Sequence, residues 1–288
     1  MLVNSKKMLI DARNNSYAVC QFNINNLEWT KFILEECELN SAPVMLGVSS
    51  GAAKYMGGYN TVYNMVNALI KDLNITIPVV LHLDHGSDFE TCKKAIDAGF
   101  TSVMIDASKY DLDKNIEITK KVTDYAKGFN VTVEAEIGHI GGEEDGIAGN
   151  ILYAEVDDCL ALTKETNIDS LAPALGSVHG IYKGEPKLEY NRMLEIKNNT
   201  NLPLVLHGAS GIPEHDIKKA ISCGIAKINI NTDLQIAWSK KVREFLNNDS
   251  EVYDPRKIIK SGEVEFKKTV CEKLLLTGSI NQFNTPKI

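Results

Sequence analysis

The sequence lacks the features that would place the protein in a membrane, outside the cell or on a polyanion. No apolar run reaches the ~18 residues that a transmembrane helix needs, and residues 1–7 contain no apolar segment of a signal peptide. None of the six cysteines forms a CxxC pair, and their wide scatter favours reduced thiols. The formal net charge of −7 argues against an extended nucleic-acid surface or an anionic membrane partner. We therefore expect a soluble cytoplasmic protein.

Short apolar runs alternate with amphipathic stretches along most of the 288 residues. The runs predict strands at residues 17–22, 43–48, 79–86, 102–105, 131–136, 170–173, 202–206 and 225–229. The intervening stretches predict helices at residues 27–39, 61–73, 91–98, 115–127, 156–166, 190–199 and 214–223. Eight such units predict an α/β fold, a (β/α)8 TIM barrel, which typically takes about 250 residues. We expect one domain over residues 1–288, with a helical appendix from about residue 253 that packs on the barrel or on a neighbour.

Polar residues fall at the carboxyl ends of the predicted strands, where a barrel of this kind has its active site. The third run ends in Asp84, His85 and Gly86, which predicts a metal ligand at His85 and a proton-transferring carboxylate at Asp84. Other strand-end or following residues are Asn23, Ser49, Asp106, Glu136, His179, His207 and Asn229. The fold would bring all of them to one rim, which favours a single site over scattered loop polarity.

Three of these residues are histidines that are each followed by glycine: His85, His179 and His207. Three neutral imidazoles around one divalent ion, with an open position for substrate, are typical of a catalytic zinc site. A fourth histidine, His82, lies inside the third strand and is either structural or a support for the site. The pattern therefore predicts a zinc ion held by the three rim histidines.

Small residues follow the last two predicted strands, in Gly208-Ala209-Ser210 and in Asn229-Ile230-Asn231-Thr232. Such residues before a helix expose backbone N–H groups to an anion, and barrel phosphate sites commonly use these two loops. We therefore predict that the substrate carries phosphate. Because the net charge would repel it, local groups must supply the binding charge.

An acidic stretch with glycine at both ends follows the fifth strand, Gly141-Gly142-Glu143-Glu144-Asp145-Gly146. It is compatible with a mobile lid that carries a catalytic base over the substrate. It is equally compatible with a solvated acidic loop, and the residues alone do not separate the two.

Taken together, these motifs resemble those of class II ketose-bisphosphate aldolases, in particular the shorter branch of fructose-1,6-bisphosphate aldolases. The resemblance runs from Asn23 to Arg256 with the motifs in order. It is carried by Leu81-His82-Leu83-Asp84-His85-Gly86, Val133-Glu134-Ala135-Glu136-Ile137-Gly138, Gly176-Ser177-Val178-His179-Gly180, Leu206-His207-Gly208-Ala209-Ser210-Gly211 and Lys227-Ile228-Asn229-Ile230-Asn231-Thr232, together with the acidic stretch.

The resemblance implies a role for each matching residue. His85, His179 and His207 would hold the catalytic zinc, and Asp106 and Glu136 would belong to a second or alternative metal position. Asp84 would transfer the proton of the C4 hydroxyl, Glu144 would exchange the C1 proton of dihydroxyacetone phosphate, and Asn229 would assist at the reacting centre. The implied substrate contacts are Asn23, Ser49, Gly180, Lys183, Gly208, Ala209, Ser210, Asn229, Ile230, Asn231, Thr232 and Arg256.

The implied reaction is reversible cleavage of fructose 1,6-bisphosphate into dihydroxyacetone phosphate and glyceraldehyde 3-phosphate, in glycolysis and gluconeogenesis. Zinc would stabilise the enediolate as a Lewis acid, and a monovalent cation, Na⁺ or K⁺, would lie near the phosphate. Arg256 would reach the second phosphate from a neighbouring subunit, which implies a homodimer or homotetramer.

Other functions stay open at this point. Ala209-Ser210 replaces the glycine pair of many fructose-type members and is also familiar from tagatose-bisphosphate aldolases, whereas residues 176–184 look fructose-type. A metal-dependent hydrolase on the same barrel would use water as its nucleophile. A phosphosugar-binding module would bind without turnover, and the full set of acid, base and metal ligands argues against it.

Overall fold

Eight parallel strands form a closed barrel in this computed structural model, which describes residues 2–144, 147–149, 152–180 and 186–283. Around the barrel the strands follow the order β1-β11-β10-β8-β5-β4-β3-β2. Their bounds are Val19–Asn23 (β1), Val44–Ser49 (β2), Val79–Gly86 (β3), Ser102–Ile105 (β4), Thr132–Ile137 (β5), Ser170–Pro173 (β8), Leu204–Leu206 (β10) and Ile225–Ile230 (β11). The predicted (β/α)8 barrel is confirmed, with strand ends shifted by one or two residues. β10 starts after Pro203, which has no N–H for the sheet.

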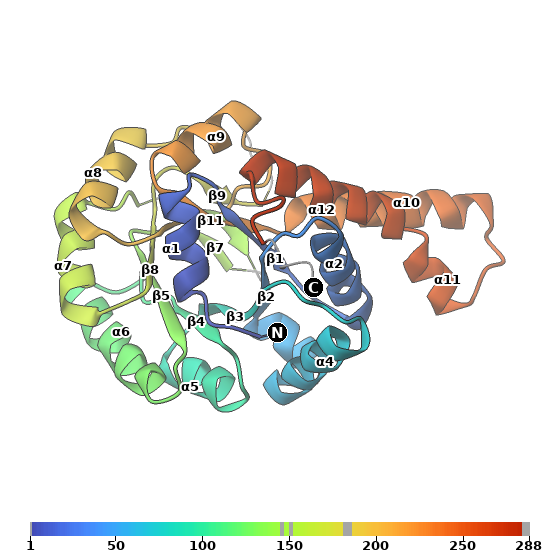
Figure 1. Ribbon diagram of the computed structural model, residues 1–288, viewed down its shortest axis with the longest axis horizontal. Coiled ribbons are helices and arrows are strands. Elements are labelled where there is room, and N and C mark those ends of the chain that lie inside the picture. The colour runs from blue at the N-terminus through green and yellow to red at the C-terminus, as the bar shows by residue number, and fades with distance from the viewer. Residues whose placement is uncertain (1, 145–146, 150–151, 181–185, 284–288) are drawn as a thin grey trace.

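A ring of helices covers the outside of the barrel (Figure 1). Their bounds are Leu27–Leu39 (α2), Tyr59–Asp72 (α4), Phe89–Asp97 (α5), Leu112–Lys127 (α6), Val156–Thr166 (α7), Tyr190–Thr200 (α8) and Glu214–Ser222 (α9). Helix α10 (Thr232–Asn248) follows β11 and leads away from the barrel. Side-chain caps fix where several begin: Asn26, Asp88 and Asp111 each accept a hydrogen bond from the backbone N–H three residues later. The strands are thus covered on both sides, which explains their apolar character.

A short helix that the sequence analysis does not predict, α1 (Lys6–Asn14), lies across the amino-terminal end of the barrel (Figure 1). Met8, Leu9 and Ala12 of α1 pack in one buried cluster with residues from the starts of four strands, Val19, Met45, Val80 and Ala226. This helix closes the end of the barrel that lies opposite the strand-end residues.

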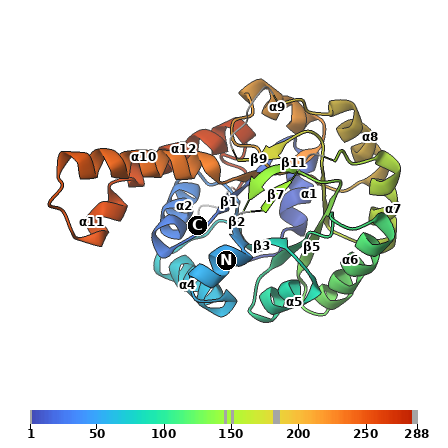
Figure 2. The same ribbon diagram turned by 180° about the vertical axis from the view of Figure 1, so that it is seen from behind.

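Two further unpredicted features lie near the other end, and Figure 2 shows β7 and β9 of the second one. Helix α3 (Ser50–Tyr55) follows β2 directly. A small sheet joins β6 (Gly141–Glu144), β7 (Ile147–Gly149) and β9 (Val178–His179). In it, the acidic stretch pairs antiparallel with residues 147–149 and parallel with the strand that carries His179. The backbone of residues 141–144 is therefore paired strand rather than open loop.

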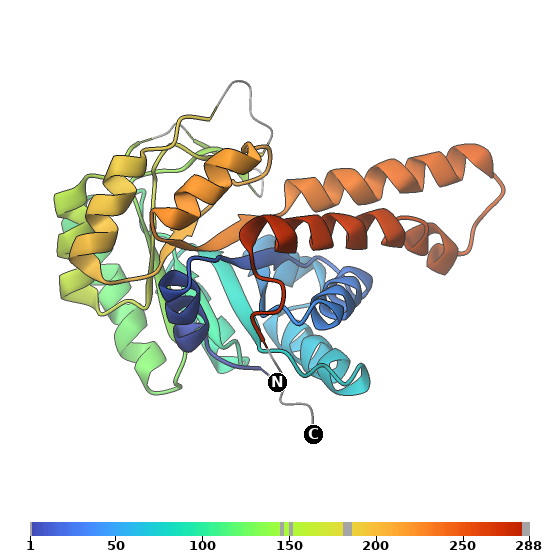
Figure 3. The ribbon, with the colours of Figure 1, turned by 45° about the horizontal axis from the view of Figure 1, so that its top comes forward.

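The carboxyl-terminal part is helical, as predicted, with α11 (Pro255–Lys260) and α12 (Glu263–Thr277). Together with α10 these helices form an arm, α10–α12, that projects from the barrel and has α11 at its far end (Figure 3). Phe266 of α12 packs against Trp29 and Phe32 of α2, with ring centroids 4.8 and 5.9 Å away, and this contact anchors the arm to the barrel. Within the described part of the chain, no helix is both long and apolar enough to span a bilayer.

Candidate active site

The structure brings the predicted strand-end residues together at the open end of the barrel. Asn23 and Ser49 are the last residues of β1 and β2, and Asp106 directly follows β4. Glu136 and Asn229 lie next to the ends of β5 and β11, and His207 follows β10. Parallel strands in a closed barrel point their carboxyl ends the same way, so residues far apart in the sequence share one rim.

Asp84 and His85 are adjacent in β3, and neighbouring residues of a regular strand point to opposite faces. A register shift relative to β4 between Leu83 and Gly86 interrupts this alternation. His85 itself has a φ of 49°, in the left-handed region that a histidine rarely occupies. The irregularity turns both side chains toward the barrel mouth, because Asp84 contacts Asn229 there and His85 contacts His207.

The three predicted histidine ligands converge. One nitrogen of each of His85, His179 and His207 lies within 4.8 Å of the other two. The ring centroids are 5.1 Å apart for His85–His179, 4.7 Å for His85–His207 and 5.8 Å for His179–His207. A second group, His85 with Asp106 and Glu136, meets the same distance condition. His85 belongs to both groups, so any two ions would have to share its ring.

The hydrogen bonds around the rings show which nitrogens face the centre of the site. His85 Nδ1 lies 3.0 Å from Asp106 Oδ2, and His207 Nε2 lies 3.0 Å from Glu134 Oε1. An ionised carboxylate only accepts, so each of these nitrogens carries hydrogen. In neutral rings, the remaining nitrogens, His85 Nε2 and His207 Nδ1, would then face each other at 3.0 Å with their lone pairs. This donor set fits a divalent cation.

The two carboxyls of the second group differ in charge. Burial raises the pKa of Asp106, but hydrogen bonds from His85 and Ser108 outweigh it and hold the pKa below its usual range. The pKa of Glu136 is raised well above its usual value, by complete burial and by the neighbouring charge of Asp106. Asp106 is therefore the more acidic carboxyl of this pair.

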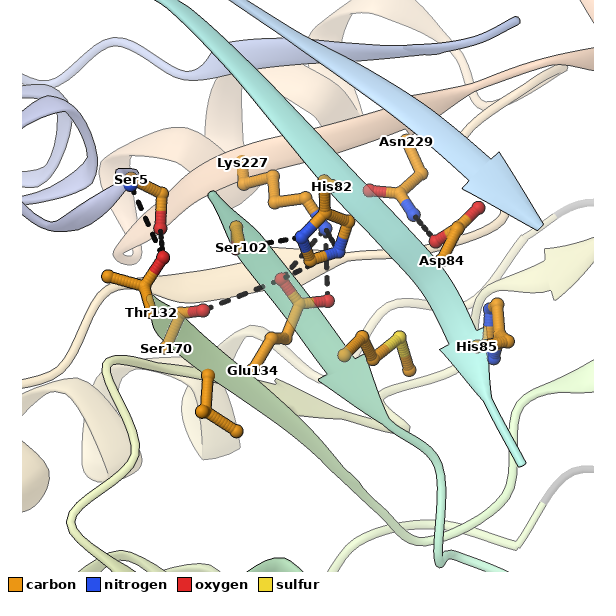
Figure 4. Close-up of polar contacts among 12 residues, drawn as sticks. Ser5, His82, Asp84, His85, Ser102, Thr132, Glu134, Ser170, Lys227 and Asn229 are labelled. Atoms are coloured by element: carbon orange, nitrogen blue, oxygen red, sulfur yellow. Dashed lines mark hydrogen bonds and ion pairs between the residues drawn. The ribbon is translucent and has the colours of Figure 1, made fainter. Parts of the chain in front are cut away.

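Asp84 is buried beside the histidines and is held from two sides. Its Oδ2 accepts a hydrogen bond from Asn23 at 3.0 Å. Its Oδ1 accepts one from Asn229 at 3.2 Å, which Figure 4 shows. The same Asn229 nitrogen lies 3.2 Å from His207 Nδ1. Two amides, from the adjacent strands β1 and β11, thus fix a carboxylate next to the histidine cluster, in a position to take or give a proton.

The predicted phosphate loops lie beside the histidines. Gly208 has a φ of 61°, and a Cβ on it would come within 2.2 Å of the Val178 carbonyl oxygen, so glycine permits close contact between the loop and β9. Ala209 and Ser210 are buried, and Asn231 and Thr232 lie at the start of α10. The side chain of Ile230 packs in the hydrophobic core, so only its backbone can contact a ligand.

The remaining predicted contacts are placed less completely. Gly180 directly follows β9 with a φ of 84°. Lys183 lies outside the described residues. Glu144 ends β6, where its backbone pairs with Ile147. Arg256 is exposed on α11 of the arm and pairs with Asp254 at 2.9 Å.

Two charged residues of the barrel interior have no role in the sequence analysis: Glu134 and Lys227. Both are fully buried and hydrogen-bonded to each other. Their positions could have been found from the two-residue period of strands, because residues two apart point to the same face. Glu134 lies two residues before Glu136, and Lys227 lies two residues before Asn229. His82, two residues before Asp84, completes this layer beneath the rim.

Comparisons with known proteins agree with this geometry. A sequence model of the family described as "Fructose-bisphosphate aldolase class-II" matches residues 3–282. The chain is 58% identical to a fructose-bisphosphate aldolase of Staphylococcus epidermidis over 98% of its own length and 99% of the relative's. It is 57% identical to one of Geobacillus stearothermophilus, over 96% and 97%. The crystal structure of the YdjI aldolase of Escherichia coli superposes with a TM-score of 0.87 at 33% identity, covering 99% of this chain and all of that one.

Proposed function

The chain belongs to the class II fructose-bisphosphate aldolase family, and from this premise we propose how its barrel mouth works. The reaction is the reversible aldol cleavage of fructose 1,6-bisphosphate to dihydroxyacetone phosphate and glyceraldehyde 3-phosphate. The observation that carries the proposal is the convergence of His85, His179 and His207, from three separate segments, within 4.8 Å of one another. These residues would hold a zinc ion, which supplies a Lewis acid for the charge that develops on the triose half.

Asp84 is the proposed base for the C4 hydroxyl. Its two amide partners keep the carboxylate oriented, and each such proton transfer typically contributes about 10²–10⁴-fold to the rate. Asn229 reaches both Asp84 and His207, so it would keep the base and the metal ligand in register. Glu144 is the proposed residue for exchange of the C1 proton, carried by the small sheet that also contains His179.

Backbone groups of the two small-residue loops would bind the phosphate of the triose product. Residues 208–210 and 230–232 lie beside the histidines, and the second loop leads into the amino terminus of α10, whose N–H groups favour an anion. Gly180, Asn23, Ser49 and Lys183 would complete the contacts. We also propose a monovalent cation, Na⁺ or K⁺, near this phosphate, and Asp106 with Glu136 and His85 as a second metal position.

We infer that the active form is a homodimer or homotetramer in which Arg256 reaches the second phosphate in a neighbouring subunit. The support is its place on α11, at the far end of the arm, next to Tyr253, a large aromatic residue that is 90% exposed. The molar mass in solution, measured by sedimentation over a range of protein concentrations, tests the assembly. The activity of an Arg256→Ala variant tests the role of the arginine. A monomeric protein of full activity would contradict it.

A role in glycolysis and gluconeogenesis in the cytoplasm follows from the proposed substrate. All six cysteines are free, and five of them are buried, which is compatible with a reducing compartment.

We propose a preference for fructose bisphosphate over tagatose bisphosphate. This preference needs a direct test, because the pair Ala209-Ser210 is also familiar from aldolases that cleave tagatose bisphosphate, the C4 epimer. Cleavage of the two sugars should be measured side by side, with metal analysis of the same sample and with a chelator. We expect faster cleavage of fructose bisphosphate and loss of activity with the metal. Undiminished activity after complete metal removal would refute the zinc mechanism.

A further inference from the structure

An ion pair lies inside the barrel, one layer below the histidines (Figure 4). Lys227 Nζ is 2.7 Å from Glu134 Oε2 and 3.0 Å from Oε1, and neither side chain is more than 1% exposed. Their strands, β11 and β5, are not neighbours, so the pair spans the interior rather than one edge of the sheet. Burying two charges is expensive and gives little stability over an apolar pair of similar volume. The pair therefore calls for a role other than stability.

The hydrogen bond from this pair to the site has only one possible direction. Glu134 Oε1 lies 3.0 Å from His207 Nε2. Both oxygens of Glu134 contact the Lys227 ammonium, at 3.0 and 2.7 Å, so the group is the carboxylate of an ion pair and can only accept. His207 Nε2 must then carry hydrogen, and in the neutral ring Nδ1 keeps its lone pair. Nδ1 is the nitrogen that faces His85, at 3.0 Å.

We propose that Glu134 and Lys227 are positioning residues for His207. They hold its proton on Nε2 and aim the Nδ1 lone pair at the metal, and so set how tightly the metal binds. The inference rests on the proposed metal site. Residues that fix a ligand histidine in this way typically contribute 10–100-fold to metal affinity.

Lys227 explains why Glu134 supports the histidine and does not bind the metal itself. Its ammonium contacts both carboxylate oxygens and also lies 3.5 Å from His82 Nε2. An ammonium only donates, so His82 Nε2 accepts, and its Nδ1–H donates to Ser102 at 2.8 Å. The lysine is thus held on a second side by a neutral histidine. Anchored in this way, it keeps Glu134 from rotating toward the ion.

The test compares two double variants that both remove the buried charges. Glu134→Gln with Lys227→Met keeps an amide oxygen that can accept from His207. Glu134→Leu with Lys227→Met removes the acceptor at similar volume. Zinc dissociation constants are measured by chelator competition, and circular dichroism of the metal-free proteins checks that both fold. We expect the glutamine variant to stay within about threefold of the parent and the leucine variant to bind 10–100-fold more weakly. Equal affinities in the two variants would overturn the proposal.

A second measurement gives a result on the parent protein alone and does not depend on catalysis. In the metal-free parent, ¹⁵N NMR of the His207 ring should show hydrogen on Nε2, and the glutamine variant should retain this signature. The leucine variant should show a mixture of the two tautomers. Hydrogen on Nδ1 in the parent would refute the inference even if the leucine variant failed to fold. Absence of aldol cleavage with the expected tautomer would instead refute the proposed function alone.

Discussion

Asn229 donates a hydrogen bond to Asp84 across the barrel mouth, with 3.2 Å between its nitrogen and the carboxylate Oδ1. The two residues are 145 positions apart in the chain, on β11 and β3. Together with Asn23, this amide accounts for both oxygens of a buried carboxylate. The arrangement makes Asp84 a fixed group beside the histidines, and this has a direct experimental consequence.

Replacing Asp84 by alanine should separate metal binding from cleavage. The variant should retain zinc, because the three proposed histidine ligands do not include Asp84. Cleavage should fall by about 10²–10⁴-fold, because the proton-transferring group is lost. Metal content and cleavage rate are measured on the same preparation, with Asp84→Asn as the control that keeps the shape. Loss of zinc from the alanine variant would show that Asp84 is structural.

Replacing Glu144 by alanine should slow proton exchange at C1 of dihydroxyacetone phosphate. The readout is deuterium uptake from solvent into this triose in the absence of aldehyde, which isolates the step from cleavage. Glu143→Ala is the matched control, because it removes the same charge from the neighbouring position of β6. Equal exchange rates in parent and Glu144→Ala would remove Glu144 from the mechanism.

The buried His82 should make the metal-free protein sensitive to acid. Burial and the charge of Lys227 lower the pKa of His82 from 6.5 to about 3, so the folded state stays unprotonated while the unfolded state takes up a proton. Stability is therefore lost as the pH falls from 6.5 toward 3, by about 1.4 kcal/mol per pH unit for this group.

Urea unfolding at pH 7, 6 and 5 measures this slope. His82→Gln keeps an acceptor for Lys227 and should lose about that part of the pH dependence. His215→Gln changes an exposed histidine, with 80% of its side chain accessible, and serves as the control. Identical slopes for parent and His82→Gln would mean that other groups govern the acid transition.

Replacing Gly208 by alanine should disturb the site through the backbone of β9. The added Cβ would meet the Val178 carbonyl oxygen at 2.2 Å and the His179 nitrogen at 3.0 Å, so the segment that carries His179 must move. We expect weaker zinc binding and a lower melting temperature. Gly58→Ala is the control, because Gly58 also has a positive φ, 114°, but no atom lies within 4 Å of its Cβ. It should cost only the backbone strain, about 1–3 kcal/mol.

The barrel and most of its rim could be predicted from the sequence, because each strand is a short apolar run and most of these runs end in a polar residue or are followed by one. His207 and Asn229 are examples: their place after an apolar run fixes which end of the barrel they occupy. The period of strands, however, would send Asp84 and His85 to opposite faces. Both side chains face the barrel mouth because of the register shift between β3 and β4 and the left-handed φ of His85. No local sequence pattern predicts either feature.

The pairing of the small sheet and the buried ion pair, which both join distant segments, were not predicted. Gly142 gives no sign that its strand pairs with His179, because the pairing depends on a segment more than thirty residues away. Likewise, Lys227 in a buried strand looks like an exception to the rule that charged side chains are buried only with a partner. The structure supplies that partner, Glu134, across the barrel interior. A charged residue inside a strand acquires its meaning only from a partner across the barrel.

Helix α1 closes the amino-terminal end of the barrel, because Met8, Leu9 and Ala12 pack against the starts of the strands. We therefore expect substrates and products to exchange through the rim at the opposite end. The Glu134–Lys227 pair then lies between the rim and α1, and α1 shields it from bulk solvent on the amino-terminal side of the barrel. Deleting the residues up to the end of α1 would expose the amino-terminal end of the barrel and would let water approach the ion pair from that end.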